Sequence, residues 1–356
     1  MLKRVSIQNF KSLKDVTLDL QKVNLLIGPN NSGKTNFLKA LEFCQKHQPL
    51  TTALMFNQQV SNNVKIHLSF DYFKPSLSQV YDNLVFKVFN NEDNEVLEED
   101  SYSYTTESLS TQEEMISDYY ESNLFGYSGN IKLYRPNPTL FIQPAEFSAD
   151  AIELAGDCSN LISFLFYINT NYKRAYKQIE TDLSNCVNDI VSFSTPPIKV
   201  GKQSKLGLKL FGRKDEDYWA DDVSEGVLYF LALLTIINQP NPPKLLLLEE
   251  PEKGIHPRRI REVMDFIFRL AEEKDIQIIL TTHNEHVLDD FATRPESVFV
   301  FDKDEDGATY VRNLQTDIIE PTNKRNSEMG LDPIDLTTNL SENWLYGLLG
   351  GVPSIV

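Results

Sequence analysis

The segment GPNNSGKT at residues 28–35 constrains the fold of this chain more than any other feature. It matches the pattern G-x-x-x-x-G-K-[ST] without a gap, between the apolar run VNLLI at 23–27 and the helix-like stretch KTNFLKALEF at 34–43. Glycines let successive backbone N–H groups point at one anion, and the partial positive charge at a helix N-terminus adds to the attraction. The sequence therefore predicts a strand, a phosphate-binding loop and a helix, the start of a nucleotide-binding α/β fold.

Side chains of this loop have predicted roles toward a nucleoside triphosphate. Lys34 is expected to reach the β- and γ-phosphates, and the Thr35 hydroxyl is expected to ligate Mg²⁺. The other residues of the loop and its flank that are predicted to bind the nucleotide are Asn30, Asn31, Ser32, Gly33 and Asn36.

A second motif supplies carboxylates. KLLLLEEPEKGIHP at 244–257 contains four leucines from Leu245, which predict a buried parallel strand, followed by Glu249 and Glu250. Such a strand ends beside the phosphate loop of its neighbour in the sheet. Glu249 is expected to orient magnesium, directly or through water, although aspartate is usual there, and Glu250 is expected to activate the attacking water as general base.

Two more elements follow a consistent order along the chain. VSEGVLYFLALLTII at 223–237 places Ser224 at the N-cap of an apolar helix, and DIQIILTTH at 275–283 predicts a buried strand that ends at His283. Taken alone, the first is an ordinary helix start and the second a common structural histidine. The order of phosphate loop, S-E-G helix, carboxylate strand and histidine connects them.

These motifs together resemble the ABC-type ATPase heads of the SMC, RecF and OLD-like group, and most closely the stand-alone ATPases labelled AAA-21. The matching segments run almost end to end and are IQNFKSL, GPNNSGKTN, LYRPNP, DCSNL, VSEG, LLLLEEPEKGIHP, TTH and WLYGLLGGVP. VSEG departs from the usual L-S-G-G-Q signature of such heads.

The resemblance implies a working dimer of two heads, each ATP lying between one phosphate loop and the signature helix of the other subunit. Ser224 and Gly226 would then contact the γ-phosphate in trans, His283 would sense it, and Glu250 would be the general base. Lys11 matches a basic position near the nucleotide in this group, and Gln143 is the candidate for the Q-loop.

The predicted fold is α/β, a P-loop NTPase of the ABC/SMC-head type with a mixed sheet, an antiparallel β subdomain and a helical lobe. The expected segments are 1–87 with the phosphate loop and antiparallel strands, 88–131 as a flexible acidic insertion, 132–198 as the helical lobe, 199–318 with a basic hairpin, the signature helix, the carboxylate strand and the switch histidine, and 319–356 as a tail that packs on or links to a partner.

Three other chemistries are disfavoured by their missing residues. TNKRN at 322–326 offers Asn326 where the GTP-reading N-K-x-D motif needs Asp, so ATP is preferred over GTP. FDKDEDG at 301–307 imitates a calcium loop, but Asn313 stands where the twelfth-position glutamate is needed, and its alternating flanks predict a polar hairpin turn. No second acidic cluster supports a nuclease site of the TOPRIM type.

Charge and cysteine usage bear on partners and location. The net charge of −17 argues against a generally basic surface, but KVGKQSKLGLKLFGRK at 199–214 carries six positive charges and no acid. This run predicts a hairpin that contacts DNA or RNA phosphates, forms a solvated edge, or meets the acidic insertion. The three scattered cysteines and the absence of a signal-peptide core or a spanning apolar stretch lead us to expect a cytoplasmic protein without a membrane segment. Against a membrane-transporter ATPase stand the IQNFKSL segment, the long insertion between Lys87 and Lys132, and the weak VSEG signature.

Two functional hypotheses follow. The first is a magnesium-dependent ATPase, a homodimer or higher oligomer, whose ATP-driven closure switches a separate effector protein; similar ATPases occur beside nuclease-like partners in bacterial antiphage systems. The second is a RecF-like module that clamps duplex DNA with ATP. DNA binding abolished by neutralising Lys202, Lys205 and Lys209 would favour the second.

Overall fold

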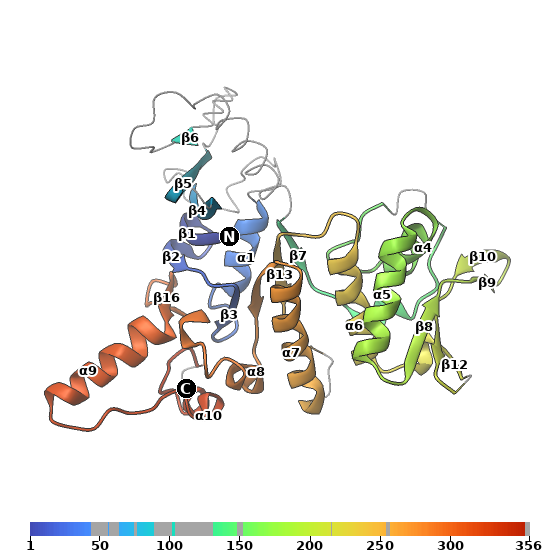
Figure 1. The fold of residues 1–356 in the computed structure, drawn as a ribbon. Coiled ribbons are helices and arrows are strands. Elements are labelled where there is room, and N and C mark those ends of the chain that lie inside the picture. The colour runs from blue at the N-terminus through green and yellow to red at the C-terminus, as the bar shows by residue number, and fades with distance from the viewer. Residues whose placement is uncertain are drawn as a thin grey trace. The chain divides into compact units, whose positions relative to one another are not determined.

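The computed structural model describes residues 1–43, 56, 64–74, 77–88, 102–103, 131–147, 152–214, 216–253 and 257–352 (Figure 1). The chain forms two compact units that alternate along the sequence. The first unit comprises Met1–Ile131, Leu245–Glu250 and Phe268–Val356, and the second comprises Lys132–Lys244 and Pro251–Ile267. The carboxylate strand therefore belongs to the same unit as the phosphate loop, although more than a hundred residues of the second unit separate them in sequence.

The core of the first unit is a mixed sheet with the strand order β16-β15-β3-β14-β13. Its strands are β3 (Val23–Ile27), β13 (Leu245–Glu249), β14 (Gln277–Thr281), β15 (Val298–Lys303) and β16 (Thr309–Asn313). β14 runs parallel to both β3 and β13, β15 runs parallel to β3, and β16 is antiparallel to β15. All residues of β3 and β14 are buried, which is why both strands are mainly apolar. The predicted parallel strands are confirmed.

A second sheet of the first unit is antiparallel, with the order β2-β1-β4-β5-β6. Its strands are β1 (Leu2–Phe10), β2 (Leu13–Asp19), β4 (Val64–Lys74), β5 (Leu77–Val88) and β6 (Tyr102–Ser103). In β1 the buried Val5 and Ile7 alternate with more exposed polar residues, as expected of a strand with one face on the core. This sheet is the predicted antiparallel subdomain, and the turn between β1 and β2 carries Lys11 and Ser12.

The second unit contains the predicted helical lobe. Its helices include α3 (Pro138–Phe141), α4 (Leu161–Asn171), α5 (Lys173–Cys186) and α6 (Glu225–Asn238), and α7 (Pro257–Glu273) begins in this unit. α6 is buried from Gly226 to Ile237, which explains its lack of a polar face. Near its end, Asn238 Nδ2 donates to Asp182 Oδ2 of α5 at 3.0 Å.

The basic run does not form one hairpin over 199–214, so that prediction is wrong in its extent. β9 (Pro197–Val200) and β10 (Gln203–Leu206) pair as a hairpin, but β11 (Lys209–Gly212) joins a separate sheet between β8 (Ile190–Ser194) and β12 (Asp217–Trp219). The apolar side chains of Leu208 and Leu210 are buried, and this burial takes the chain away from the hairpin.

Two other sequence features can be placed in the first unit. FDKDEDG forms the predicted turn between β15 and β16, where Gly307 N donates to Asp304 O at 3.0 Å and Ala308 N donates to Asp304 Oδ1 at 2.8 Å. The acidic insertion 88–131 falls outside the described residues apart from Val88, β6 and Ile131. Within the described part of the chain, no helix has both the length and the apolar character needed to cross a bilayer. The five-segment division stays a prediction.

The C-terminal part of the first unit has one packed and one projecting piece. A π-helical segment, Leu314–Ile319, leads into α9 (Glu320–Glu328), which has no buried residue and projects from its unit (Figure 1). α10 (Leu340–Leu345) then packs beside α8 (Glu285–Asp289), where Ser341 N donates to Asp289 Oδ1 at 2.9 Å.

Candidate functional site

The phosphate loop follows β3 and needs glycine at two positions. A Cβ at Gly28, where φ is +142°, would lie 2.2 Å from the backbone oxygen of Phe301. A Cβ at Gly33, where φ is +108°, would lie 2.2 Å from Thr309 Oγ1. Only glycine tolerates both the conformation and the close approach, so β15 and β16 determine where the glycines of the motif stand.

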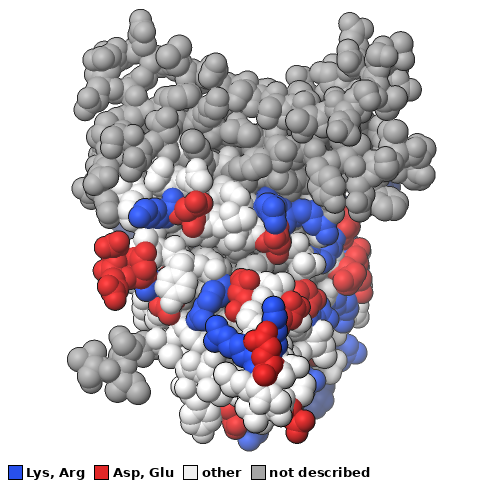
Figure 2. All heavy atoms as spheres, turned by 90° about the vertical axis from the view of Figure 1, so that its left-hand side faces the viewer, with Lys and Arg blue, Asp and Glu red and all other residues white. Residues whose placement is uncertain are grey.

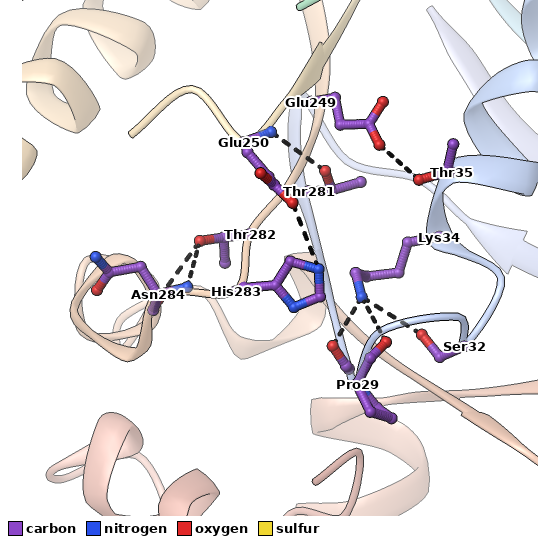
Figure 3. A network of polar contacts seen from close by, with 11 residues as sticks. Pro29, Ser32, Lys34, Thr35, Glu249, Glu250, Thr281, Thr282, His283 and Asn284 are labelled. Carbon is purple, nitrogen blue, oxygen red and sulfur yellow. Dashed lines mark hydrogen bonds and ion pairs between the residues drawn. The ribbon is translucent and has the colours of Figure 1, made fainter. Parts of the chain in front are cut away.

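Lys34, the first residue of α1 (Lys34–Phe43), folds back over this loop (Figure 3). Its Nζ donates to Gly28 O at 2.7 Å and to Pro29 O at 2.9 Å, and it lies 3.4 Å from Ser32 Oγ. The side chain is only 4% exposed, and burial lowers the pKa of Lys34 to about 8 in spite of the nearby carboxylates. A buried ammonium held by neutral carbonyl oxygens would gain from an anion placed in the loop.

Thr35 and Glu249 lie together at the end of β13. Thr35 Oγ1 donates to Glu249 Oε1 at 2.6 Å (Figure 3). Hydroxyl and carboxylate oxygens are the donors that Mg²⁺ prefers, and this ion usually takes one or two protein ligands together with phosphate oxygens and water. Among the described residues, no group of three or more His, Cys, Asp or Glu side chains gathers as a metal site. The Thr35–Glu249 pair fits magnesium bound with a nucleotide.

Glu250 has an unusual backbone. Its φ is +48°, in the left-handed region that residues other than glycine seldom adopt. Two contacts hold the turn, since Glu250 N donates to Thr281 O at 3.1 Å and approaches Thr281 Oγ1 at 3.3 Å. A strained non-glycine residue that neighbouring strands hold in place is typical of functional positions.

His283 faces this carboxylate from the end of β14. Its Nε2 lies 3.5 Å from Glu250 Oε1 (Figure 3). Burial, followed by the charge of Lys34, lowers the pKa of His283, so the imidazole is neutral at pH 7. The neighbouring turn is firmly built, because Thr282 N donates to Leu26 O and Asn284 N donates to Thr282 Oγ1 at 2.9 Å.

The remaining predicted residues take other places. Asn30 and Asn31 are exposed on the loop, and Asn36 Nδ2 donates to Ser12 Oγ at 2.9 Å. Lys11 is partly buried in the turn between β1 and β2, where φ is +50° and burial lowers its pKa. Gln143 is exposed just after α3 in the second unit.

The start of α6, in the second unit, lies where the sequence predicts it. Ser224 occupies the N-cap position, and its backbone oxygen accepts from Val227 N at 3.0 Å, but its side chain makes no capping hydrogen bond. The predicted N-cap position of Ser224 is therefore confirmed, and this serine is exposed. A Cβ at Gly226 would meet nothing within 4 Å. Packing among the described residues explains neither residue type.

Sequence reasoning missed two polar residues at the loop. Thr309, at the start of β16, donates through Oγ1 to Ser32 O at 2.9 Å, and it lies 2.8 Å from Ser12 Oγ. Ser12 is part of the quoted IQNFKSL motif, but Thr309 stands in an ordinary alternating strand with no local sign of a role.

The fold and this site define a P-loop nucleoside triphosphatase with the architecture of an SMC head. The chain belongs to the AAA_15 family, "AAA ATPase domain", which matches residues 1–192, and it is an ATPase of that general kind. A second family, AAA_21, described as "AAA domain, putative AbiEii toxin, Type IV TA system", matches residues 200–289. The predicted resemblance and fold class are thereby confirmed.

Individual relatives agree with this family. An "ATP/GTP phosphatase" of Helicobacter pylori is 24% identical over 349 residues, which cover 81% of this chain and 87% of that protein. The ATP-binding protein EcfA2 of an energy-coupling factor transporter from Geobacillus kaustophilus is 28% identical over 113 residues, covering 31% of this chain and only 37% of the relative. The Smc head domain solved with the C-terminal domain of ScpA from Pyrococcus furiosus superposes with a TM-score of 0.53 at 14% identity, covering 92% of this chain and 99% of that one. At that identity the likeness concerns the fold alone.

Proposed function

We propose that this protein is a magnesium-dependent ATPase whose ATP-driven dimerisation acts as a switch on a separate effector protein. The observation that carries the proposal is the convergence of five side chains at the carboxyl ends of three neighbouring strands. These side chains are Lys34, Thr35, Glu249, Glu250 and His283, all in the first unit. Ligands of open α/β sheets bind at this edge.

Each side chain has a chemical task that suits its surroundings. Lys34 and the loop N–H groups would bind the β- and γ-phosphates, and Thr35 and Glu249 would hold the magnesium ion, which neutralises charge on the phosphate oxygens. Glu250 would accept the proton of the attacking water, because its Oε1 lies beside His283 and its charge acts on Lys34 of the loop. A neutral His283 could donate to the γ-phosphate without adding a charge to the free site.

We further propose that the second half of each site comes from another copy of the chain. Ser224 and Gly226 are the candidate trans residues, since the hydroxyl of Ser224 does not cap its own helix and open space adjoins Gly226. The free N–H groups at the start of α6, a helix of fourteen residues, are suited to a phosphate. Binding of two nucleotides would hold two copies together, and hydrolysis would release them.

The effector is proposed by analogy with the relatives. The AAA_21 family is described as a putative toxin of a type IV system, and one of the solved Smc heads is bound to a partner protein, the C-terminal domain of ScpA. For this chain we propose an effector protein, of the nuclease class, in bacterial antiphage defence. Exposed apolar side chains after α9 and in the α10 region offer a surface for it, and they are Met329, Leu331, Ile334, Leu345, Tyr346 and Leu348.

The alternative, a RecF-like clamp on duplex DNA, has weaker support. In the basic run, Lys205 pairs with Glu146 at 3.0 Å and Lys209 pairs with Asp217 at 2.6 Å, so carboxylates already balance these charges. On the face of the first unit in Figure 2, basic and acidic side chains are interspersed without a basic stripe. Duplex binding that requires ATP and falls steeply with salt would revive this alternative.

The experiment uses a variant that is expected to bind ATP without hydrolysing it. Tagged Glu250→Gln protein with ATP and Mg²⁺ should elute at twice the mass of the chain and should co-purify with the effector, identified by mass spectrometry. The Lys34→Ala variant should elute as a monomer and lose that protein. A monomeric Glu250→Gln protein at saturating ATP would contradict the proposal that ATP drives dimerisation.

A further inference from the structure

A chain of hydrogen-bonded polar side chains connects α1 with the backbone of the phosphate loop. It starts at Asn36 on α1, passes through Ser12 in the turn between β1 and β2, continues to Thr309 on β16, and ends at the backbone oxygen of Ser32. The three links measure 2.9, 2.8 and 2.9 Å. Both ends therefore lie on the phosphate loop and its helix, while the middle belongs to the β1–β2 turn and to β16.

The direction of each hydrogen bond follows from what each group can donate. The single hydroxyl proton of Thr309 goes to Ser32 O, so Thr309 Oγ1 must accept from Ser12 Oγ. Ser12 Oγ in turn accepts from the amide of Asn36. All donors point the same way along the chain, and hydrogen bonds arranged in this way strengthen one another.

The last link determines how the phosphate loop presents its backbone. In a planar trans peptide the C=O and N–H bonds point in opposite directions. Because Thr309 holds the oxygen of Ser32, the N–H of Gly33 is turned to the opposite side of the same peptide. Thr309 is 3% exposed and fills the space where a Gly33 side chain would stand.

We propose that Thr309 and Ser12 are positioning residues of the nucleotide site, which they act on through the Ser32–Gly33 peptide. Their hydroxyls hold this peptide in its anion-binding orientation before the nucleotide arrives. They also join it to the turn that carries Lys11. The inference deepens the proposed function and rests on it for the identity of the ligand, a nucleoside triphosphate.

A backbone contact makes the hydroxyls testable by substitution. Thr309 N donates to Ser12 O at 2.8 Å, and this bond survives when either hydroxyl is removed. Thr309→Val keeps the shape of the side chain and deletes only the hydrogen bonds, whereas Thr309→Ser keeps the hydroxyl. Thr17→Val is a matched control, because Thr17 Oγ1 and Ser6 Oγ form a pair of the same 2.8 Å length in the same β1–β2 region without touching the loop.

Binding is measured by calorimetry with ATP and Mg²⁺ in the Glu250→Gln background, so that no hydrolysis intervenes. Thr309→Val should raise the Kd about tenfold, because it leaves the buried Ser32 oxygen without its donor, while Thr309→Ser stays within about threefold of the parent. In otherwise wild-type protein, KM should rise with Kd, and kcat should change less than about threefold. A merely structural loss would lower the binding stoichiometry and kcat while the Kd of the folded fraction stayed unchanged.

Ser12→Ala provides a second, smaller perturbation in case Thr309→Val folds poorly. It should also raise the Kd for ATP. The Kd of the double variant should rise by less than the product of the two single increases, because both substitutions act through the same series of hydrogen bonds. A Kd for both single variants equal to that of Thr17→Val would overturn the inference. Failure of the wild-type protein to hydrolyse ATP would instead count against the proposed function, since the binding comparison does not depend on turnover.

Discussion

At the scale of single residues, Glu250 bears the chemical step in the proposed mechanism. Replacing it with Gln removes the base while keeping the side-chain volume, so kcat should fall about 10²–10⁴-fold while the Kd for ATP stays within about threefold. Phosphate release in the steady state measures the first quantity and calorimetry the second. Glu285→Gln is the matched control, because Glu285 also lies beside a histidine, His286, at 4.0 Å, away from the loop. Turnover by Glu250→Gln at the wild-type rate would contradict the assignment.

The lowered pKa of Lys34 leads us to expect that stability and ATP binding depend on pH. Its pKa is about 8 in the free protein, below its ordinary value, so above pH 8 the unfolded chain binds more protons at this residue than the folded one. This residue alone therefore makes the free energy of unfolding rise with pH from about 8 toward its ordinary pKa. Phosphates should raise the pKa of Lys34 again, so ATP binding above pH 8 takes up a proton and weakens as the pH increases.

Calorimetry at pH 8.5 in two buffers of different ionisation enthalpy measures this uptake. We expect a positive value below one proton per ATP, and the same value in His283→Asn, because burial already keeps His283 neutral at that pH. Zero uptake would show that Lys34 is fully charged before the nucleotide binds.

The residues of the site differ in how far the sequence could predict them. Glu249 and Glu250 stand at the end of one buried strand, His283 lies just after the next, and Lys34 follows β3 after the phosphate loop. Because parallel strands end at one edge of a sheet, the meeting of these residues could be expected. The pairing of Ser12 with Thr309 could not, because 297 positions separate the two hydroxyls and only the tertiary fold brings them together.

At the scale of elements, burial on both faces made β3, β13 and β14 recognisable as mainly apolar segments. A different pattern, alternation, misled us over 199–214, where it continues across Gly207 although the strands on either side belong to different sheets. Alternation indicates that a strand has one apolar and one polar face, but it does not indicate which strand lies next to it in the sheet.

The segment after α10 lies against the phosphate loop, so we expect a substitution in it to affect both stability and ATP binding. Gly351 has φ +66°, and a Cβ there would lie 2.6 Å from Val300 Cγ1 and 3.4 Å from Gly28 Cα. Gly351→Ala should therefore lower the free energy of unfolding by about 2–4 kcal/mol, through both backbone strain and overpacking. Chemical denaturation followed by tryptophan fluorescence measures the change.

Gly330 offers the control for this substitution. Its φ of +68° is nearly the same, but a Cβ there meets nothing within 4 Å, so Gly330→Ala should cost only about 1 kcal/mol of strain. Gly351→Ala should also weaken ATP binding, because the clash of its methyl group with Val300 displaces a segment that lies against the first glycine of the loop. Equal losses of stability in the two variants would show that the tail does not pack on the loop as described.

At the scale of the whole molecule, the two units alternate along the sequence, and one carries the phosphate loop and its carboxylates while the other carries α6, the proposed signature helix. Each unit is compact in its own right, and the chain crosses between them near Ile131, Leu245, Glu250 and Phe268. In the proposed mechanism, a nucleotide site is complete only when the first unit of one copy meets the second unit of another.

Complementation between two inactive variants tests this claim most directly. Lys34→Ala removes the phosphate ligand from one half-site, and Ser224→Glu places a negative charge on the other, so each variant alone should hydrolyse no ATP. After mixing in equal amounts, each pair of unlike copies has one intact site, so phosphate release should appear that neither variant shows alone, at no more than about a quarter of the wild-type rate. A mixture no more active than its separate components would contradict the shared site.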